Sequence, residues 1–140
     1  MKVLVDTSVW SLALRRNAAD LSSVDRMLVS ALRELIQEGR AQIVGPIRQE
    51  LLSGMREPER YRKVRDQLRA FPEPLLQAGD YEEAAQMCNQ CRRRGISGSP
   101  IDFLICAVAQ RQHWQIFTTD QDFENYRKAI SVRPYMPTPS

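Results

Sequence analysis

The sequence has a single histidine, an odd number of cysteines and no long apolar segment. His113 is the only histidine among 140 residues, so carboxylates form the main set of possible metal ligands. No apolar run approaches the roughly 20 residues needed to cross a bilayer, and the first strand candidate reaches Asp6 too early for a secretory hydrophobic region. The odd number of cysteines, three, favours a reducing compartment. We therefore expect a cytoplasmic protein with no membrane association.

The excess of positive charge is small. Twenty lysines and arginines stand against 17 aspartates and glutamates, which gives a net charge of +3. This charge is compatible with a nucleic-acid partner but does not require one. The length fits one domain, which we place at residues 1–133, followed by a proline-rich C-terminal tail at residues 134–140.

Short apolar segments alternate with longer segments of helical periodicity. Strands are predicted at residues 3–5, 43–44, 115–119 and 130–132, and helices at residues 7–16, 24–36, 46–54, 58–68, 80–94 and 100–109. Asp80 is expected to open the fifth of these helices in a capping box. The alternation predicts an α/β fold with a short parallel sheet covered by helices on both faces. Ligands bind such sheets outside the carboxyl ends of the strands.

Four carboxylates, with a fifth nearby, stand where folding does not require a negative charge. Asp6 and Asp120 follow predicted strands, Glu50 lies in a short helix, and Asp102 lies in the first turn of the most apolar helix; Asp122 follows close behind. Taken singly, the three loop and strand-end aspartates could be helix caps and Glu50 a solvated residue. If the group converges, repulsion and desolvation disfavour it unless a cation is bound. Mg²⁺ or Mn²⁺, which prefer oxygen ligands, are the expected ions.

Four segments resemble the motifs of PIN-domain proteins of the VapC toxin type. They are Val-Leu-Val-Asp-Thr-Ser-Val-Trp at 3–10, Ile-Arg-Gln-Glu-Leu-Leu-Ser-Gly at 47–54, Asp-Phe-Leu-Ile-Cys-Ala-Val-Ala at 102–109 and Phe-Thr-Thr-Asp-Gln-Asp-Phe at 117–123. Their order and spacing agree over nearly the whole chain. The resemblance implies a three-layer α/β/α fold and cleavage of single-stranded RNA that depends on Mg²⁺ or Mn²⁺. It also implies a homodimer and a cognate antitoxin, as in type II toxin–antitoxin systems.

The resemblance assigns roles residue by residue. Asp6, Glu50 and Asp102 match the three main acidic positions, and Asp120 matches a fourth, so these four are the expected catalytic residues. Asp122 is a further ligand or a cap. The hydroxyls of Thr7 or Ser8, together with Thr119, are expected to donate hydrogen bonds to the metal-binding carboxylates.

The implied reaction is hydrolysis of a phosphodiester by a metal-activated water. Asp6 and Asp102 would hold the metal directly. Glu50 and Asp120 would bind it through water or complete a second metal site, and either one would orient the attacking water. Arginines would contact RNA phosphates unless they only form a solvated face; they are Arg15, Arg16, Arg92, Arg93 and Arg94.

Three other interpretations compete with the nuclease. A PIN-like fold can bind RNA or protein without cutting. A phosphatase with Asp6 as nucleophile, like the haloacid dehalogenase family, would need a second aspartate where Ser8 stands. Finally, Cys88, Cys91, Cys106 and His113 supply the ligand types of a zinc site, although helical spacing favours buried thiols for the first two.

Overall fold

Three short parallel strands form the centre of the structure, a computed structural model that describes residues 1–138. β1 (Val3–Val5) lies between β2 (Ala41–Gln42) and β3 (Gln115–Phe117), so the strand order is β2-β1-β3. All three side chains of β1 are fully buried, because helices cover both faces of this strand. Its sequence is accordingly apolar throughout.

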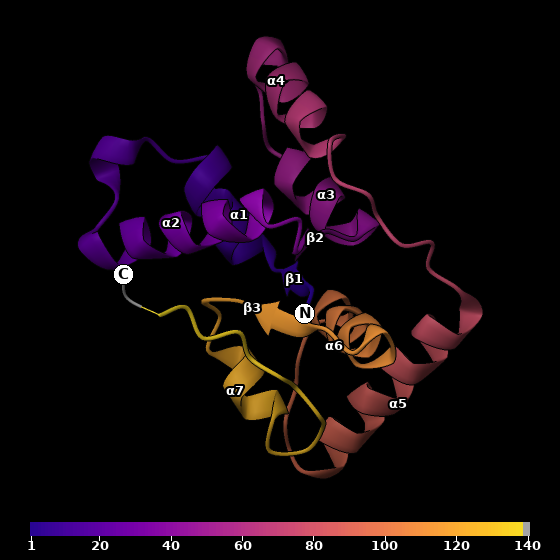
Figure 1. The fold of residues 1–140 in the computed structure, drawn as a ribbon. Coiled ribbons are helices and arrows are strands. Elements are labelled where there is room, and N and C mark those ends of the chain that lie inside the picture. Colours follow the sequence, from indigo (N-terminus) through magenta and orange to yellow (C-terminus); the bar gives the residue numbers. More distant parts are fainter. Residues whose placement is uncertain (139–140) are drawn as a thin grey trace.

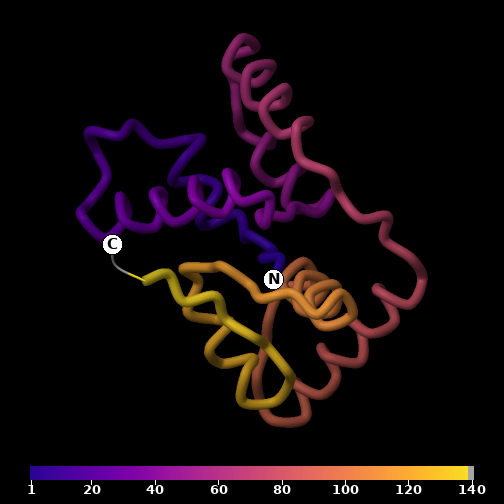
Figure 2. The backbone as a smooth tube through the Cα atoms, in the orientation of Figure 1, coloured from indigo at the N-terminus to yellow at the C-terminus, as the bar shows by residue number. Residues whose placement is uncertain are grey.

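Seven α-helices in residues 1–138 surround the sheet. They are α1 (Thr7–Leu14), α2 (Ser23–Gln37), α3 (Gly45–Leu52), α4 (Pro58–Leu68), α5 (Ala78–Arg93), α6 (Pro100–Gln112) and α7 (Asp122–Tyr126). Helices α1, α2 and α3 lie on one side of the strands, and α5, α6 and α7 lie on the other (Figure 1). The backbone trace separates the same two groups (Figure 2). The predicted three-layer α/β/α fold is therefore confirmed.

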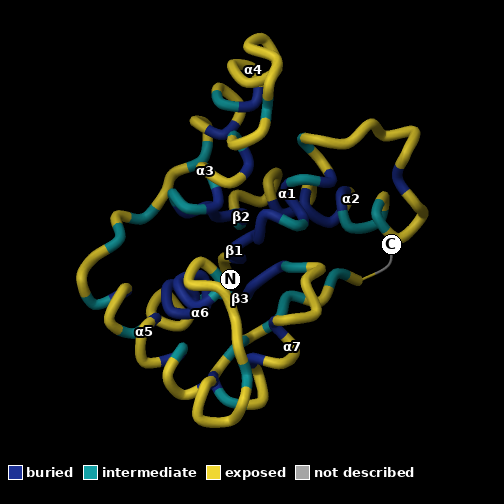
Figure 3. The backbone as a smooth tube through the Cα atoms, turned by 180° about the vertical axis from the view of Figure 1, so that it is seen from behind, coloured by how far each residue is buried: buried dark blue, intermediate teal, exposed yellow. Residues whose placement is uncertain are grey.

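The most apolar segment of the sequence forms the centre of one helical layer. Seven consecutive residues of α6, from Phe103 to Ala109, are buried. Figure 3 colours most of this helix and β1 as buried. Ser99 accepts a hydrogen bond from the Asp102 N–H and Pro100 occupies the first turn, so this helix begins where the sequence predicts. None of the helices in residues 1–138 is both long and apolar enough to span a bilayer.

Two strand predictions are wrong, one in position and one because the strand does not form. The strand predicted at residues 43–44 lies two residues earlier, because Val44 already serves as the N-terminal cap of α3. The strand predicted at residues 130–132 is absent. Instead, Ile116 donates to the carbonyl of Arg133 and accepts from the N–H of Tyr135, both at 2.8 Å. Pro134 fits between them because this position needs no N–H donor.

Part of the proline-rich end packs against the sheet. The ring of Tyr135 lies 5.1 Å from that of Phe117 and 5.9 Å from the guanidinium carbon of Arg40. The domain boundary at residue 133 stays a prediction, and residues 139–140 of the expected tail lie outside the described residues.

The start of α5 differs from the predicted capping box by three residues. Gln77 is the capping residue, and Asp80 stands at the third position of the helix, where its Oδ2 accepts a hydrogen bond from the Gln77 N–H at 2.9 Å. The other oxygen of Asp80 pairs with Arg111 of α6 at 2.8 Å. This ion pair links α5 to α6. Because Asp80 is buried, the pair also prevents an unpaired charge in the interior.

Replacing Arg111 by methionine is expected to destabilise the fold by about 1–2 kcal/mol. The loss is smaller than the 3–5 kcal/mol of a fully buried pair, because Arg111 is 45% exposed. The melting temperature should fall by roughly 3–8 °C. Arg127→Met is the matched control, because its pair with Glu124 is exposed on both sides. Equal melting temperatures for the two variants would contradict the role of the Asp80 pair.

Candidate metal-binding site

The ends of β1 and β3 place Asp6 beside Thr118. The parallel register pairs Val5 with Phe117, and the Asp6 N–H donates to the Phe117 carbonyl at 2.9 Å. The residues that follow these two partners are therefore neighbours. This is the carboxyl edge of the sheet, where ligands bind in folds of this kind.

Two hydroxyl groups hold the carboxylate of Asp6. Ser8 Oγ and Thr118 Oγ1 both donate to Asp6 Oδ2, at 2.9 and 2.8 Å. Asp6 stands at the capping position of α1, but its side chain makes no capping hydrogen bond. The cap interpretation of Asp6 is therefore wrong. Its Oδ1 has no hydrogen-bond partner in residues 1–138 and remains free to bind a ligand.

Three further aspartates converge at the same edge. Asp102 in the first turn of α6, Asp120 after β3 and Asp122 at the start of α7 each place a carboxylate oxygen within 4.8 Å of the others. The Asp122 N–H donates to Asp120 Oδ1 at 2.9 Å, so Asp120 also fixes the beginning of α7. A capping role and a place in the acidic cluster are thus compatible for Asp120. We call Asp102, Asp120 and Asp122 the aspartate cluster.

The pKa of Asp102 shows how unfavourable this arrangement is without a cation. Burial raises the pKa of Asp102 above its ordinary value, and the negative charges of Asp6 and Asp120 raise it further. A hydrogen bond from Tyr126 partly offsets both effects. A divalent cation would remove the repulsion, and oxygen-only ligands suit Mg²⁺ or Mn²⁺. The residues present therefore fit such an ion.

The side chain of Tyr126 contacts the aspartate cluster through Asp102. Its hydroxyl donates to Asp102 Oδ2 at 2.7 Å, and its fully buried ring lies 5.0 Å from that of Phe103 and 5.3 Å from that of Phe123. A Cβ on Gly98 would approach the Tyr126 oxygen to 2.5 Å. Gly98 is therefore needed for the tyrosine to reach Asp102. Tyr126 could not be identified from the sequence, because its spacing from Phe123 indicates only a core residue.

The family model described as "PIN domain" matches residues 3–129, which is most of the chain. The protein belongs to the PIN-domain family. The four motifs singled out in the sequence all lie within the matched range, and this PIN domain carries Asp6 and the aspartate cluster at the carboxyl edge of its sheet.

Several solved structures share the fold of this PIN domain. FitAcB from Neisseria gonorrhoeae is 18% identical with a TM-score of 0.72, over 96% of this chain and 97% of that one. VapBC2 from Rickettsia felis, bound to a DNA fragment from its promoter, is 12% identical with a TM-score of 0.73, over 96% and 98%. The Mycobacterium tuberculosis toxin VapC20, which cleaves the sarcin–ricin loop, is 20% identical with a TM-score of 0.66, over 95% and 100%. At these identities the likeness establishes the fold.

The hydroxyl predictions are correct only in part for this PIN domain. Ser8 donates to Asp6 as expected. Thr119 uses its backbone N–H, which donates to Ser8 Oγ at 3.0 Å, and the neighbouring Thr118 supplies the hydroxyl. The hydroxyl of Thr7 is buried and has no partner in residues 1–138. The strand register, once known, would have identified Thr118.

Glu50 is not part of the aspartate cluster. Glu50 is exposed in α3, the helix that follows β2. In the sheet, β2 and β3 lie on opposite sides of β1. The structure therefore brings together Asp102, Asp120 and Asp122 with Asp6 close enough to raise the pKa of Asp102. A catalytic role for Glu50 stays a prediction.

The arginines predicted to contact RNA differ in their surroundings. Arg15 donates to the carbonyl of Ser53, and Arg94 to that of Lys128. Arg16, Arg92 and Arg93 are exposed and form no ion pair within residues 1–138. These three remain available to bind phosphate.

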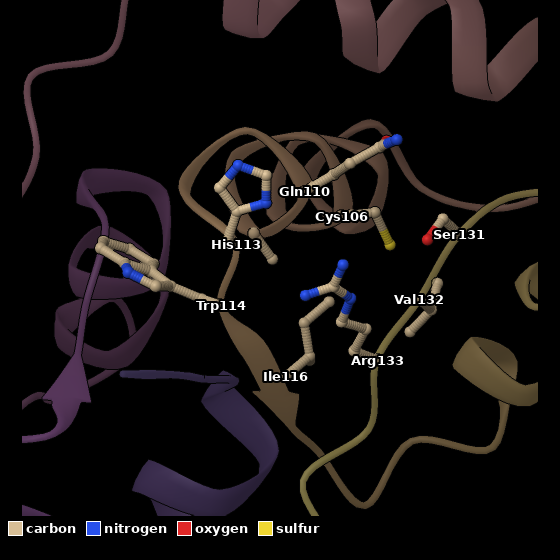
Figure 4. A pocket seen from close by; sticks show the side chains of 9 residues that line it. Cys106, Gln110, His113, Trp114, Ile116, Ser131, Val132 and Arg133 are labelled. Carbon is tan, nitrogen blue, oxygen red and sulfur yellow. The ribbon is translucent and has the colours of Figure 1, made fainter. Parts of the chain in front are cut away.

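The cysteines and His113 do not form a metal site in this PIN domain. The aspartate cluster is the one group of three or more potential ligands that converges within residues 1–138. Cys106 and His113 instead line a pocket of about 150 Å³ near the start of β3, at the opposite end of this strand from Asp120 (Figure 4). Burial raises the pKa values of the Cys91 and Cys106 thiols, which keeps both groups protonated. The zinc interpretation is therefore wrong, and PIN membership argues equally against the phosphatase.

Proposed function

We propose that this protein is a metal-dependent endoribonuclease and the toxin of a toxin–antitoxin pair, with Mg²⁺ as its cofactor and Mn²⁺ as a substitute. The observation that carries the proposal is the convergence of Asp102, Asp120 and Asp122 at the carboxyl edge of a PIN-domain sheet. Such a cluster is unfavourable without a cation, as the raised pKa of Asp102 indicates. A site with a purely structural role would have no need of this cluster of negative charges.

The chain's own residues would divide the work of binding the metal and the substrate. Asp102 and Asp6 would hold the metal, with Asp120 and Asp122 as further ligands. The hydroxyls of Ser8 and Thr118 donate hydrogen bonds to Asp6 Oδ2. They would thereby orient the carboxylate and leave Asp6 Oδ1 to bind the metal. When bound, the ion would lower the pKa of a coordinated water and polarise the scissile phosphate. Either Glu50 or Asp120 would orient that water.

The partners proposed for this protein follow from its relatives. The similar structures include a toxin–antitoxin complex from Klebsiella pneumoniae and a toxin that cleaves the sarcin–ricin loop. We therefore propose RNA as the substrate, a cognate antitoxin that masks the aspartate cluster, a homodimeric state and a cytoplasmic location. Arg16, Arg92 and Arg93 would supply positive charge for RNA phosphates.

A cleavage assay with single-stranded RNA and structured tRNA tests the proposal. The wild-type protein is incubated with Mn²⁺, with Mg²⁺ and with EDTA, beside Asp6→Asn, which keeps acceptors for Ser8 and Thr118 but removes the charge. We expect cleavage with either metal, none with EDTA, and a loss of at least about 100-fold in the variant. Binding of Mn²⁺ is measured on the same samples. Absence of both cleavage and metal binding would favour the alternative in which this PIN domain binds RNA or protein without cutting.

A further inference from the structure

The pocket at the start of β3 has no part in the proposed nuclease reaction. It lies between this strand, the end of α6 and the segment of residues 131–133, whereas the aspartate cluster lies beyond the other end of β3 (Figure 4). Its volume is about 150 Å³, and none of its nine lining residues is acidic. The lining does contain an arginine and the single histidine of the chain. The charged groups of the pocket therefore favour an anion.

The guanidinium of Arg133 supplies the positive charge of the pocket. Figure 4 shows this side chain extended toward Cys106 of α6 and the ring of His113. It forms no ion pair or hydrogen bond within residues 1–138, where other arginines make these contacts. The backbone of Arg133 is held in place, because its carbonyl accepts from the Ile116 N–H at 2.8 Å. The N–H donors of a well-anchored arginine therefore remain for a ligand.

His113 has a backbone conformation that usually selects another residue. It caps the end of α6 with φ of 61°, and it is the one non-glycine residue of positive φ in the described part of the chain. Glycine or asparagine is preferred in this conformation, because the side chain of another residue adds strain. Such strain concentrates at functional sites. A histidine at this position therefore indicates a role for the imidazole, which lines the pocket.

Three side-chain donors from two parts of the chain line the same small space. Arg133 and Ser131 come from the segment before the C-terminus, and His113 comes from the end of α6. A guanidinium, a hydroxyl and an imidazole N–H can donate together to an anion that offers at least three oxygens. A tetrahedral oxyanion meets this condition, whereas a carboxylate has two oxygens. Sites for drug-sized ligands measure roughly 300–1,000 Å³, so this pocket suits a phosphate group better than a whole nucleotide.

The edge of the sheet that borders the pocket carries a further positive charge. Lys2 directly precedes β1, and its carbonyl accepts from the N–H of Gln115, the first residue of β3, at 3.3 Å. The side chain of Lys2 forms no ion pair within residues 1–138. The aspartates, in contrast, gather at the carboxyl edge. This separation of charge favours an anion at the amino edge of the sheet and a cation at the carboxyl edge.

We propose that the pocket binds a phosphate group through the Arg133 guanidinium, the His113 imidazole and the Ser131 hydroxyl. The group is either inorganic phosphate or the terminal phosphate of a small monoester, since both present the same oxygens. Its binding links the segment of residues 131–133 to the end of α6 and stabilises the folded chain. This site is separate from the proposed metal site and does not depend on nuclease activity.

The single histidine of the chain provides a direct test. In untagged protein, the Hε1 proton of His113 gives the one histidine Hε1 signal of the proton NMR spectrum. The protein is titrated with sodium phosphate in EDTA, at constant pH and ionic strength. We expect this signal to shift to a plateau, with a dissociation constant of about 1 mM or below. A signal that does not reach a plateau, or does not move, would overturn the proposal.

Arg133→Gln and Arg33→Gln form a matched pair for this titration. Arg133→Gln removes the charge but keeps the backbone contact with β3, and we expect the dissociation constant to rise at least about 10-fold. Arg33 is exposed on α2, so Arg33→Gln should bind phosphate as wild type does. Both substituted side chains are exposed, so the fold should persist, which thermal unfolding checks. Equal affinity in Arg133→Gln and wild type would refute the assignment of the site.

A comparison of anions tests the shape of the ligand and identifies its source. Sodium chloride and sodium acetate at equal ionic strength should not shift the His113 signal to a plateau. Acetate that binds as tightly as phosphate would refute a site for a tetrahedral oxyanion. Adenosine 5′-monophosphate separates the two sources, because tighter binding than that of inorganic phosphate assigns the site to a monoester. Equal or weaker binding of the nucleotide assigns the site to inorganic phosphate.

The outcome is independent of the nuclease proposal, because the titration contains no metal and no RNA. Phosphate binding that depends on Arg133, in a protein that neither binds Mn²⁺ nor cuts RNA, would support the pocket and refute the nuclease. RNA cleavage by a protein whose His113 signal ignores phosphate would do the reverse.

Discussion

Replacing Asp102 by asparagine is expected to abolish metal-dependent RNA cleavage and, at the same time, to stabilise the metal-free protein. Asp102 shares the aspartate cluster with Asp120 and Asp122, and the charge of Asp6 also acts on it. Loss of this carboxylate removes one of the proposed metal ligands, and we expect cleavage to fall at least about 100-fold. Asparagine is similar in size and still accepts the hydrogen bond from Tyr126. However, the substitution removes the repulsion between the carboxylate at position 102 and those of Asp6 and Asp120.

The pH dependence of stability provides a separate measurement of the same effect. Burial raises the pKa of Asp102 in the folded state above its ordinary value of 3.8. The folded state therefore binds a proton more tightly than the unfolded chain, and the resulting stability is present below pH 3.8 and is lost as pH rises through the raised pKa. Asp102→Asn should remove this loss, so the metal-free variant should melt at a higher temperature than wild type at neutral pH.

Metal addition should reverse the order of stability. Mn²⁺ is expected to raise the melting temperature of wild type and to leave Asp102→Asn nearly unchanged. Asp66→Asn is the matched control, because Asp66 pairs with Arg65 and Arg69 on the exposed surface of α4. It should retain both cleavage and the response to Mn²⁺. If Asp102→Asn retained either one, Asp102 would not be a metal ligand.

Removing one hydroxyl group, in Tyr126→Phe, is expected to weaken Mn²⁺ binding about 10- to 100-fold. The Tyr126 hydroxyl donates to Asp102 Oδ2 at 2.7 Å and so fixes the orientation of the carboxylate. It also favours the ionised form of Asp102, which a metal requires. Without it, Asp102 is both less well oriented and harder to ionise. We therefore expect Tyr126 to be a positioning residue that acts through Asp102.

The ring of Tyr126 allows its positioning role to be separated from its structural role. Phenylalanine retains the packing against Phe103 and Phe123, so the folded structure should persist. Tyr135→Phe is the matched control, because the Tyr135 hydroxyl forms no hydrogen bond within residues 1–138. Metal affinity is measured by titration with Mn²⁺, and stability by thermal unfolding with EDTA. A variant that lost stability but bound Mn²⁺ as wild type does would contradict the positioning role.

The sequence by itself determined the layers of this fold and most of its acidic edge. Apolar periodicity specifies α6 and β1, because a segment that is apolar on every side must be covered on every side. Local signals also located the start of α6, since Ser99 and Pro100 act on the backbone within one turn. Asp6 and Asp120 were identifiable because they directly follow strands, and parallel strands bring their ends together.

Only the tertiary structure decided which groups surround these aspartates. Thr118 rather than Thr119 binds Asp6 because the pairing of Val5 with Phe117 sets which residues are neighbours, and a shift of one residue would exchange them. Tyr126 reaches Asp102 across 24 positions of sequence through a space that Gly98 leaves open. A sequence pattern reports which residues share a face of one element. Contacts between elements depend on register and packing, and these arise only when the whole chain is folded.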